Sequence, residues 1–214
     1  MKNWLCKIKA ETLGKKIRLI RTSVILRNSL LIFIFAFVIR SIPNLLTPYP
    51  IGYDTIDYSA QILNWEQGLN NPDFLVQTPL FILVAIFIHR ITNLDPFVIV
   101  RFFQPILFGF LISSFYYASN QVFNWASGWA FLGAIIFSLQ TVTLRISWDL
   151  LRNELGLSLL LLILSQFKRP KSPTFIILTI FVGFTHQIVS FILLAIIIGL
   201  LFVRLWNNQY HQAK

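Results

Sequence analysis

The stretch VILRNSLLIFIFAFVIRSI, residues 24–42, decides the fold class. Its second part, Ser29–Ile42, is almost wholly apolar and carries one charge, Arg40. A helix rises about 1.5 Å per residue, so the whole stretch approaches the ~30 Å thickness of the hydrocarbon core of a bilayer. We therefore expect a membrane-spanning helix here, within an all-α protein.

The charges on either side of this stretch predict its orientation. The first 27 residues contain one acid, Glu11, and eight bases, which are Lys2, Lys7, Lys9, Lys15, Lys16, Arg18, Arg21 and Arg27. The 37 residues from Ser41 to Gln77 contain no Lys or Arg and four acids, which are Asp54, Asp57, Glu66 and Asp73. Because Lys and Arg favour the cytoplasmic side of a span, we expect a basic cytoplasmic arm over residues 1–23 and an external loop over residues 43–95.

Composition predicts an integral membrane protein. Of the 214 residues, 56% are hydrophobic and only 12% are charged, more apolar surface than a soluble domain of this length would bury. The net charge of +10 is also typical of nucleic-acid-binding proteins. Most of the bases, however, lie where the positive-inside rule places them, so no nucleic-acid partner is expected.

Hydropathy divides the chain into about six transmembrane helices. The expected crossings cover residues 24–42, 96–118, 125–144, 155–167, 174–185 and 188–206. The apolar segment Pro79–Ile91 is too short for a span, because its helix would rise only about 20 Å. We expect it to lie half-sunk in the outer leaflet as an amphipathic part of the external loop. The predicted organisation is a transmembrane domain over residues 24–206, with a cytoplasmic tail over residues 207–214. Seven crossings are the alternative, disfavoured because Lys168, Arg169 and Lys171 would then lie outside.

The external loop begins with a motif that carries candidate chemistry. It reads Pro48-Tyr49-Pro50-Ile51-Gly52-Tyr53-Asp54-Thr55-Ile56-Asp57-Tyr58. The prolines and the glycine predict a turn, and a helix is expected from Tyr53 to Gly68, with Ile56, Ala60, Ile62, Leu63 and Trp65 available for its apolar face. Asp54 then lies at the helix start, and Asp57 follows one turn later. Two nearby carboxylates can raise the pKa of one and supply a general base, whereas the alternative role of Asp54 is a helix cap.

The six-crossing topology brings further ionisable side chains to the outer surface. They are Arg40, Arg101, Arg145, Asp149, Arg152, Glu154 and His186. Ionisable groups at membrane depth cost on the order of 3 kcal/mol each and usually mark function. The sequence therefore predicts a mixed-charge pocket at one interface. The alternative is solvation at the headgroup level, or structural ion pairs such as Arg145–Asp149 and Asp149–Arg152.

Arg40 and the motif around Asp54 resemble the first external loop of the GT-C glycosyltransferases, which include protein O-mannosyltransferases and oligosaccharyltransferase catalytic subunits. Three later segments are also similar to the family: Asp95–Phe103, Trp148–Glu154 and Thr185–Gln187. The likeness covers about residues 25–205. It implies a multi-pass cell-membrane enzyme with a cytoplasmic N-terminus that transfers sugar from a polyprenyl-phosphate donor to an acceptor on the external face.

The resemblance assigns the role of catalytic base to Asp54. The chemistry of sugar transfer and the place of the residues at the outer surface suggest that the substrate is bound by Arg40, Asp57, Arg101, Arg145, Asp149, Arg152, Glu154 and His186. Arg101 and Arg152 are preferred for the donor phosphate, because a guanidinium pairs with phosphate oxygens in a fork. A divalent cation, Mg²⁺ or Mn²⁺, held by Asp54 with Asp149, Glu154 and His186, remains open.

Two other functions remain open. Family members are commonly much longer, so the first is a non-catalytic lipid-binding or assembly subunit, with another membrane subunit as partner beside membrane lipid. The second is a transporter, disfavoured because the chain lacks an internal repeat and its ionisable residues gather at one face rather than at the midplane.

Overall fold

The computed structural model describes residues 2–48, 51–52, 54–65, 80–167 and 170–212, and within helices it describes all side chains except those of residues 2–21, 146, 148, 149, 204 and 207–212. In this part of the chain every regular element is an α-helix, which confirms the all-α prediction. The helices are α1 (Lys2–Leu46), α2 (Asp54–Leu63), α5 (Leu80–Thr92), α6 (Pro96–Gln121), α7 (Ser127–Leu139), α8 (Thr141–Asp149), α9 (Leu151–Gln166), α10 (Pro173–Gly183) and α11 (Gln187–Gln212).

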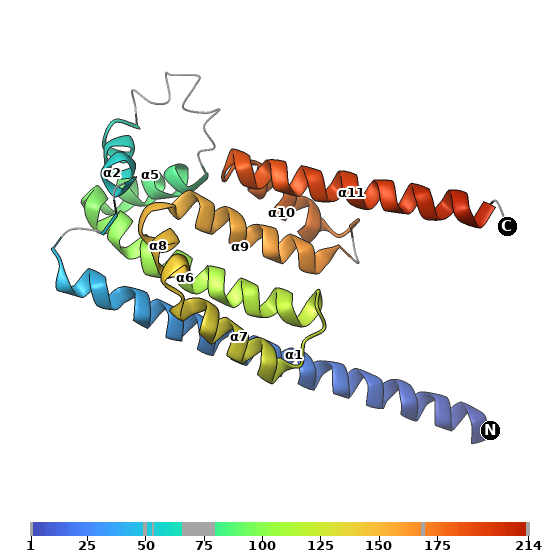
Figure 1. Cartoon of the computed structure of the whole chain (residues 1–214). Coiled ribbons are helices and arrows are strands. Elements are labelled where there is room, and N and C mark those ends of the chain that lie inside the picture. The colour runs from blue at the N-terminus through green and yellow to red at the C-terminus, as the bar shows by residue number, and fades with distance from the viewer. Residues whose placement is uncertain (1, 49–50, 53, 66–79, 168–169, 213–214) are drawn as a thin grey trace.

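The long helices run roughly along one common axis (Figure 1). Helix α6 is central and packs against α1, α7 and α9. Helices α2 and α5 lie together at one end of the bundle, which we call the α2/α5 end. Both termini lie at the opposite end, which we call the terminal end, where the N-terminal part of α1 and the C-terminal part of α11 extend beyond the other helices.

Two helices are long and apolar enough to cross a membrane. They are Thr22–Leu46, with a mean hydropathy of 2.1, and Pro96–Gln121, with a mean hydropathy of 1.8. Four other apolar helices are shorter: Leu80–Thr92, Ser127–Leu139, Pro173–Gly183 and Gln187–Val203. Membrane association is thus indicated by two candidate spans, while the six-crossing topology stays a prediction.

The surface of the bundle is strongly apolar. Large hydrophobic side chains are more than 40% exposed along α10 and α11, including Ile176, Ile180, Phe191, Leu194, Ile198 and Leu201. A soluble monomer rarely leaves so much contiguous apolar surface in water. This face is therefore suited to lipid.

Close helix approach depends on two glycines. A Cβ atom at Gly109 of α6 would lie 2.9 Å from the carbonyl oxygen of Phe33 on α1. A Cβ atom at Gly156 of α9 would lie 2.9 Å from the Thr185 hydroxyl, in the turn before α11. Small residues at these positions let the backbones come together, as in other membrane-type helix pairs.

Two sequence expectations need correction. The predicted continuous segment 125–144 is broken, because Gln140 is extended (φ −68°, ψ 131°) and separates α7 from α8. The β-branched run Thr141-Val142-Thr143 has a weak helical preference, which favours the break at this place. The predicted first crossing also ends too early, since α1 continues past Arg40 through Pro43 to Leu46.

Candidate functional site

The turn before α2 places Asp54 in the first turn of that helix. Gly52 has a positive φ of 128°, which an L-residue adopts only with strain. The Thr55 hydroxyl donates to the Gly52 carbonyl at 2.5 Å and closes the turn. The buried face of α2 consists of Thr55, Tyr58, Ser59 and Ile62, which corrects the predicted apolar face, because Ile56, Ala60 and Leu63 are exposed. Residues three or four positions apart lie on one face of a helix, so the buried face continues from Thr55 to Tyr58, Ser59 and Ile62 and does not include every apolar residue.

Polar side chains of α6 hold this loop in place. The Arg101 guanidinium donates to the carbonyls of Asn44 and Pro48, and Gln104 Nε2 donates to the carbonyl of Ile51 at 2.6 Å. In return, Asn44 Nδ2 donates to the Arg101 carbonyl at 2.9 Å. Arg101, preferred from the sequence as a phosphate ligand, thus uses its guanidinium to fix the backbone that leads to Asp54.

Tyr58 joins α2 to α9. Its side chain is 2% exposed, and its ring packs edge-to-face on Phe81 of α5 at 5.2 Å between centroids. The guanidinium carbon of Arg152 lies over the same ring, 5.4 Å from its centroid. Burial raises the pKa of Tyr58 above its ordinary value of 10.0, while the charge of Arg152 opposes this shift and that of Asp54 adds to it. Asp54, Tyr58 and Arg152 therefore share one environment.

His186 extends this environment from the turn between α10 and α11. Its side chain is half-buried, and its Nδ1 accepts a hydrogen bond from the Ile188 amide at 3.2 Å. Burial lowers the pKa of His186 below 6.5, and the positive charge of Arg152 lowers it further. A neutral ring with Nδ1 as acceptor carries its proton on Nε2. We call Asp54, Tyr58, Arg152 and His186 the polar cluster.

An apolar cavity of about 280 Å³ adjoins the polar cluster. We call it the α5–α9 groove, and its lining is Leu80, Phe81, Val84, Phe103, Leu107, Leu155, Leu159 and Phe181. Phe81 both lines the groove and contacts Tyr58. Leu155 and Leu159 follow Arg152 on α9 at steps of three and seven residues, so one face of α9 leads from the cluster into the groove.

Arg40 and Glu154 lie inside the bundle. Both side chains are 0% exposed, and their predicted position at the outer membrane surface stays a prediction. Arg40 Nη1 donates to Asn44 Oδ1 at 2.9 Å, and Nη2 donates to the carbonyl of Ser147 at 3.3 Å. Because α1 continues to Leu46, Arg40 lies more than a turn inside the helix, where α8 covers it.

Three other predicted site residues, Asp57, Arg145 and Asp149, are not assigned to the polar cluster. The side chains of Asp57 and Arg145 are exposed, and the side chain of Asp149 lies outside the described residues. The predicted ion pairs through Asp149 likewise lie outside the described residues. Among the described side chains, no three of the His, Cys, Asp and Glu residues group as a metal site would require.

Sequence reasoning missed three residues of this region: Tyr58, Asn44 and Ser147. Tyr58 was detectable in principle, because it lies one helical turn after Asp54 and shares its face. Asn44 also follows Arg40 by four residues. Ser147 contributes only a backbone carbonyl, which leaves no signal in side-chain chemistry.

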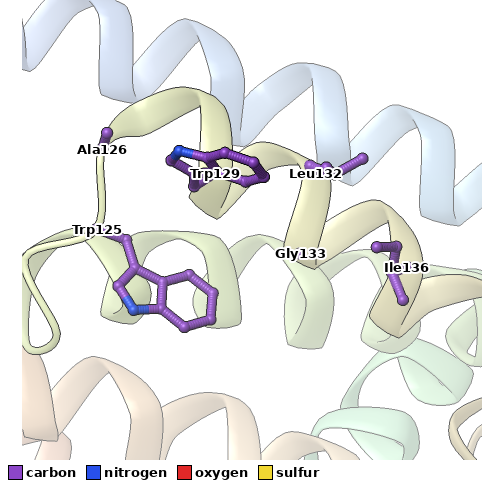
Figure 2. Close-up of a pocket in the computed structure, with 6 residues that line it drawn as sticks. All are labelled: Trp125, Ala126, Trp129, Leu132, Gly133 and Ile136. Carbon is purple, nitrogen blue, oxygen red and sulfur yellow. The ribbon is translucent and has the colours of Figure 1, made fainter.

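A larger apolar groove lies towards the terminal end of the bundle. It has a volume of about 540 Å³ and is lined by Trp125, Ala126, Trp129, Leu132, Gly133 and Ile136. Figure 2 shows the two indole rings at one end of this groove and Ile136 at the other. Its lining contains no titratable side chain, so it has no group for acid–base chemistry.

Comparisons of this chain with protein-family models, with curated proteins and with solved structures found no match. The function of the protein is therefore inferred from the geometry of the polar cluster and the α5–α9 groove.

Proposed function

We propose that this protein is an integral membrane glycosyltransferase. It would move a sugar from a polyprenyl-phosphate donor to an acceptor hydroxyl on the external face of the membrane. One observation carries the proposal: the polar cluster combines a carboxylate, a guanidinium and an imidazole, and it is joined to the apolar α5–α9 groove by Phe81, which contacts Tyr58 and lines the groove. A lipid phosphate needs such a combination, because its tail is apolar and its head is anionic.

The path of the chain supports a six-crossing topology. The successive passes are α1, α6, α7 with α8, α9, α10 and α11, with α2 and α5 between the first two passes at the α2/α5 end (Figure 1). Both termini lie at the terminal end. An even number of passes with a basic N-terminal arm fits a cytoplasmic terminal end and an external α2/α5 end. The polar cluster then faces the outer side of the cell membrane.

Donor binding divides into two parts. The isoprenoid tail occupies the α5–α9 groove, where burial of apolar surface stabilises it by about 25 cal/mol per Å². Arg152 pairs with phosphate oxygens, since a guanidinium donates in a planar fork. His186 donates from Nε2 as a neutral group, so it adds a hydrogen bond rather than a second charge.

The transfer step uses Asp54 as the general base. The carboxylate accepts the proton of the acceptor hydroxyl, whose oxygen forms a bond to the anomeric carbon of the sugar. The bond between that carbon and the phosphate oxygen breaks, and its electron pair stays on the lipid phosphate. Arg152 stabilises this developing negative charge. Arg101 acts on the loop, because its guanidinium binds the carbonyls of Asn44 and Pro48.

Transfer by the purified protein in lipid nanodiscs tests the proposal. A panel of radiolabelled polyprenyl-phosphate sugars is supplied with a mixture of acceptors, with Mg²⁺, with Mn²⁺ or with a chelator. Asp54→Asn is compared with Asp57→Asn, which removes an exposed carboxylate three residues further along the same helix. We expect release of lipid phosphate by the wild type and by Asp57→Asn, and a loss of at least 100-fold in Asp54→Asn.

Two other results would each change the conclusion. Equal turnover by Asp54→Asn and the wild type would contradict the role of Asp54. Donor binding without turnover under any metal condition would instead support a non-catalytic lipid-binding subunit.

A further inference from the structure

We propose that Tyr58 is a positioning residue that holds the Arg152 guanidinium in place within the polar cluster. The consequence for the donor phosphate rests on the proposed function. The placement of Arg152 by Tyr58 does not, and it can be tested without a donor.

Tyr58 is itself held firmly. Its ring contacts Phe81 edge-to-face at 5.2 Å, and Phe81 contacts Phe103 of α6 edge-to-face at 5.3 Å. Such edge-to-face pairs stabilise beyond the area they bury. Three aromatic rings thus connect α2, α5 and α6, and the Tyr58 ring is fixed on the central helix of the bundle.

Arg152 is attached to this fixed ring in two ways. Its guanidinium lies over the ring face at 5.4 Å, within the range of a cation–π interaction. Hydrogen bonds from Arg152 also reach the Tyr58 hydroxyl. A guanidinium stacks through its face and binds oxygens through its edge, so contact with the ring is compatible with a phosphate at the edge.

Holding Arg152 in one rotamer matters for binding. An arginine side chain that is free to rotate loses rotamer entropy when a ligand orders it. Tyr58 orders it beforehand, which is preorganisation of the site. Because burial raises the pKa of Tyr58, the phenol stays neutral and places no negative charge beside a phosphate.

The test separates the hydroxyl from the ring. Tyr58→Phe keeps the ring and its packing but removes the hydrogen bonds to Arg152. Ser59→Ala is the matched control, since it also removes a buried hydroxyl from α2, one that donates to the Thr55 carbonyl in the same helix. Arg152→Gln removes the positive charge altogether and gives the largest change expected in each readout.

The first readout is the pKa of His186, measured by NMR on protein with labelled histidine and assigned with His186→Gln. The charge of Arg152 lowers this pKa, so Arg152→Gln should raise it. Tyr58→Phe should raise it part of the way, because Arg152 loses its fixed position, and Ser59→Ala should leave it unchanged. An unchanged His186 pKa in Tyr58→Phe, beside a raised one in Arg152→Gln, would overturn the inference.

The second readout is the affinity for the donor lipid. Loss of a hydrogen bond that positions a charged group corresponds to roughly a 10-fold weaker Kd in Tyr58→Phe. If the His186 pKa moves as expected while the wild type binds no polyprenyl-phosphate sugar, Tyr58 still positions Arg152 and the proposed function fails. The two readouts therefore distinguish a failure of the positioning role of Tyr58 from a failure of the proposed function.

Discussion

Arg40 on α1 and Glu154 on α9 are both fully buried in the same bundle, and the charge of each acts on the other. Their hydrogen bonds differ. Arg40 donates to Asn44 and to the Ser147 carbonyl, whereas neither carboxyl oxygen of Glu154 has a hydrogen-bond partner among the described residues. A buried carboxyl without such partners is costly to ionise, and the positive charge of Arg40 offsets part of that cost.

Loss of Arg40 should therefore destabilise the bundle. Arg40→Met keeps an unbranched apolar stem but leaves Glu154 without its opposite charge, so we expect a loss of about 3 kcal/mol in the free energy of unfolding. Arg40→Met with Glu154→Gln should recover most of that loss. Arg145→Met, which removes an exposed arginine, is the control and should change little. Thermal unfolding in detergent measures all four proteins, and an unaffected Arg40→Met would contradict this effect of Arg40.

His186 should make the free energy of unfolding decrease as the pH falls. Its pKa is lowered from 6.5 in the folded state, so the unfolded chain binds the proton first as pH falls. The contribution is fully present above pH 6.5 and is lost as pH falls through the lowered pKa. We expect His186→Gln to show a smaller decrease in Tm than the wild type between pH 7 and pH 5. His89→Gln should decrease like the wild type, and a His186→Gln protein with the same slope would rule out this source.

Filling the α5–α9 groove should weaken donor binding. Val84 lines the groove, while its neighbour Leu83 on α5 is similarly exposed but is not part of the lining. Val84→Trp should reduce the affinity for a polyprenyl phosphate by about 10-fold or more, since the groove loses room for the apolar tail. Leu83→Trp should bind as the wild type does. Equal affinities in equilibrium binding measurements would place the tail elsewhere.

The six-crossing topology predicts opposite sides for two exposed residues. In a background with Cys6→Ser, Asp57→Cys should react with a membrane-impermeant maleimide in intact cells. Lys171→Cys should react only after permeabilisation, because the turn between α9 and α10 is then cytoplasmic. Labelling of Lys171→Cys in intact cells would contradict this topology.

Long apolar runs were enough to predict several of the helices, though not the break between α7 and α8. Segments such as 96–118 and 188–206 each lie within one helix, and the short helix α5 was expected as well. Their composition determines helical structure locally, because no other arrangement satisfies the backbone in an apolar environment. The number of crossings is not determined in this way and stays a prediction.

The depth of individual side chains was harder to predict. Arg40 and Glu154 look like surface charges in the sequence because each lies near the end of an apolar run. The burial of Arg40 involves α8, which contacts its guanidinium through the backbone carbonyl of Ser147. Tyr58 acquires its role only through Phe81 and Arg152, which are distant in the sequence. Contacts between helices of this kind have no periodic signal.

The most direct test is the affinity of the purified protein for a polyprenyl phosphate, with Arg152→Gln compared with Arg145→Gln. Both variants remove one arginine at the same change in net charge, but only Arg152 lies over Tyr58 beside the α5–α9 groove. We predict that Arg152→Gln weakens binding by about 10- to 100-fold, as expected for loss of a charge-assisted bond of about 1.5–3 kcal/mol. Arg145→Gln should bind like the wild type. Equal affinities for the two variants would contradict a lipid-phosphate site at the polar cluster.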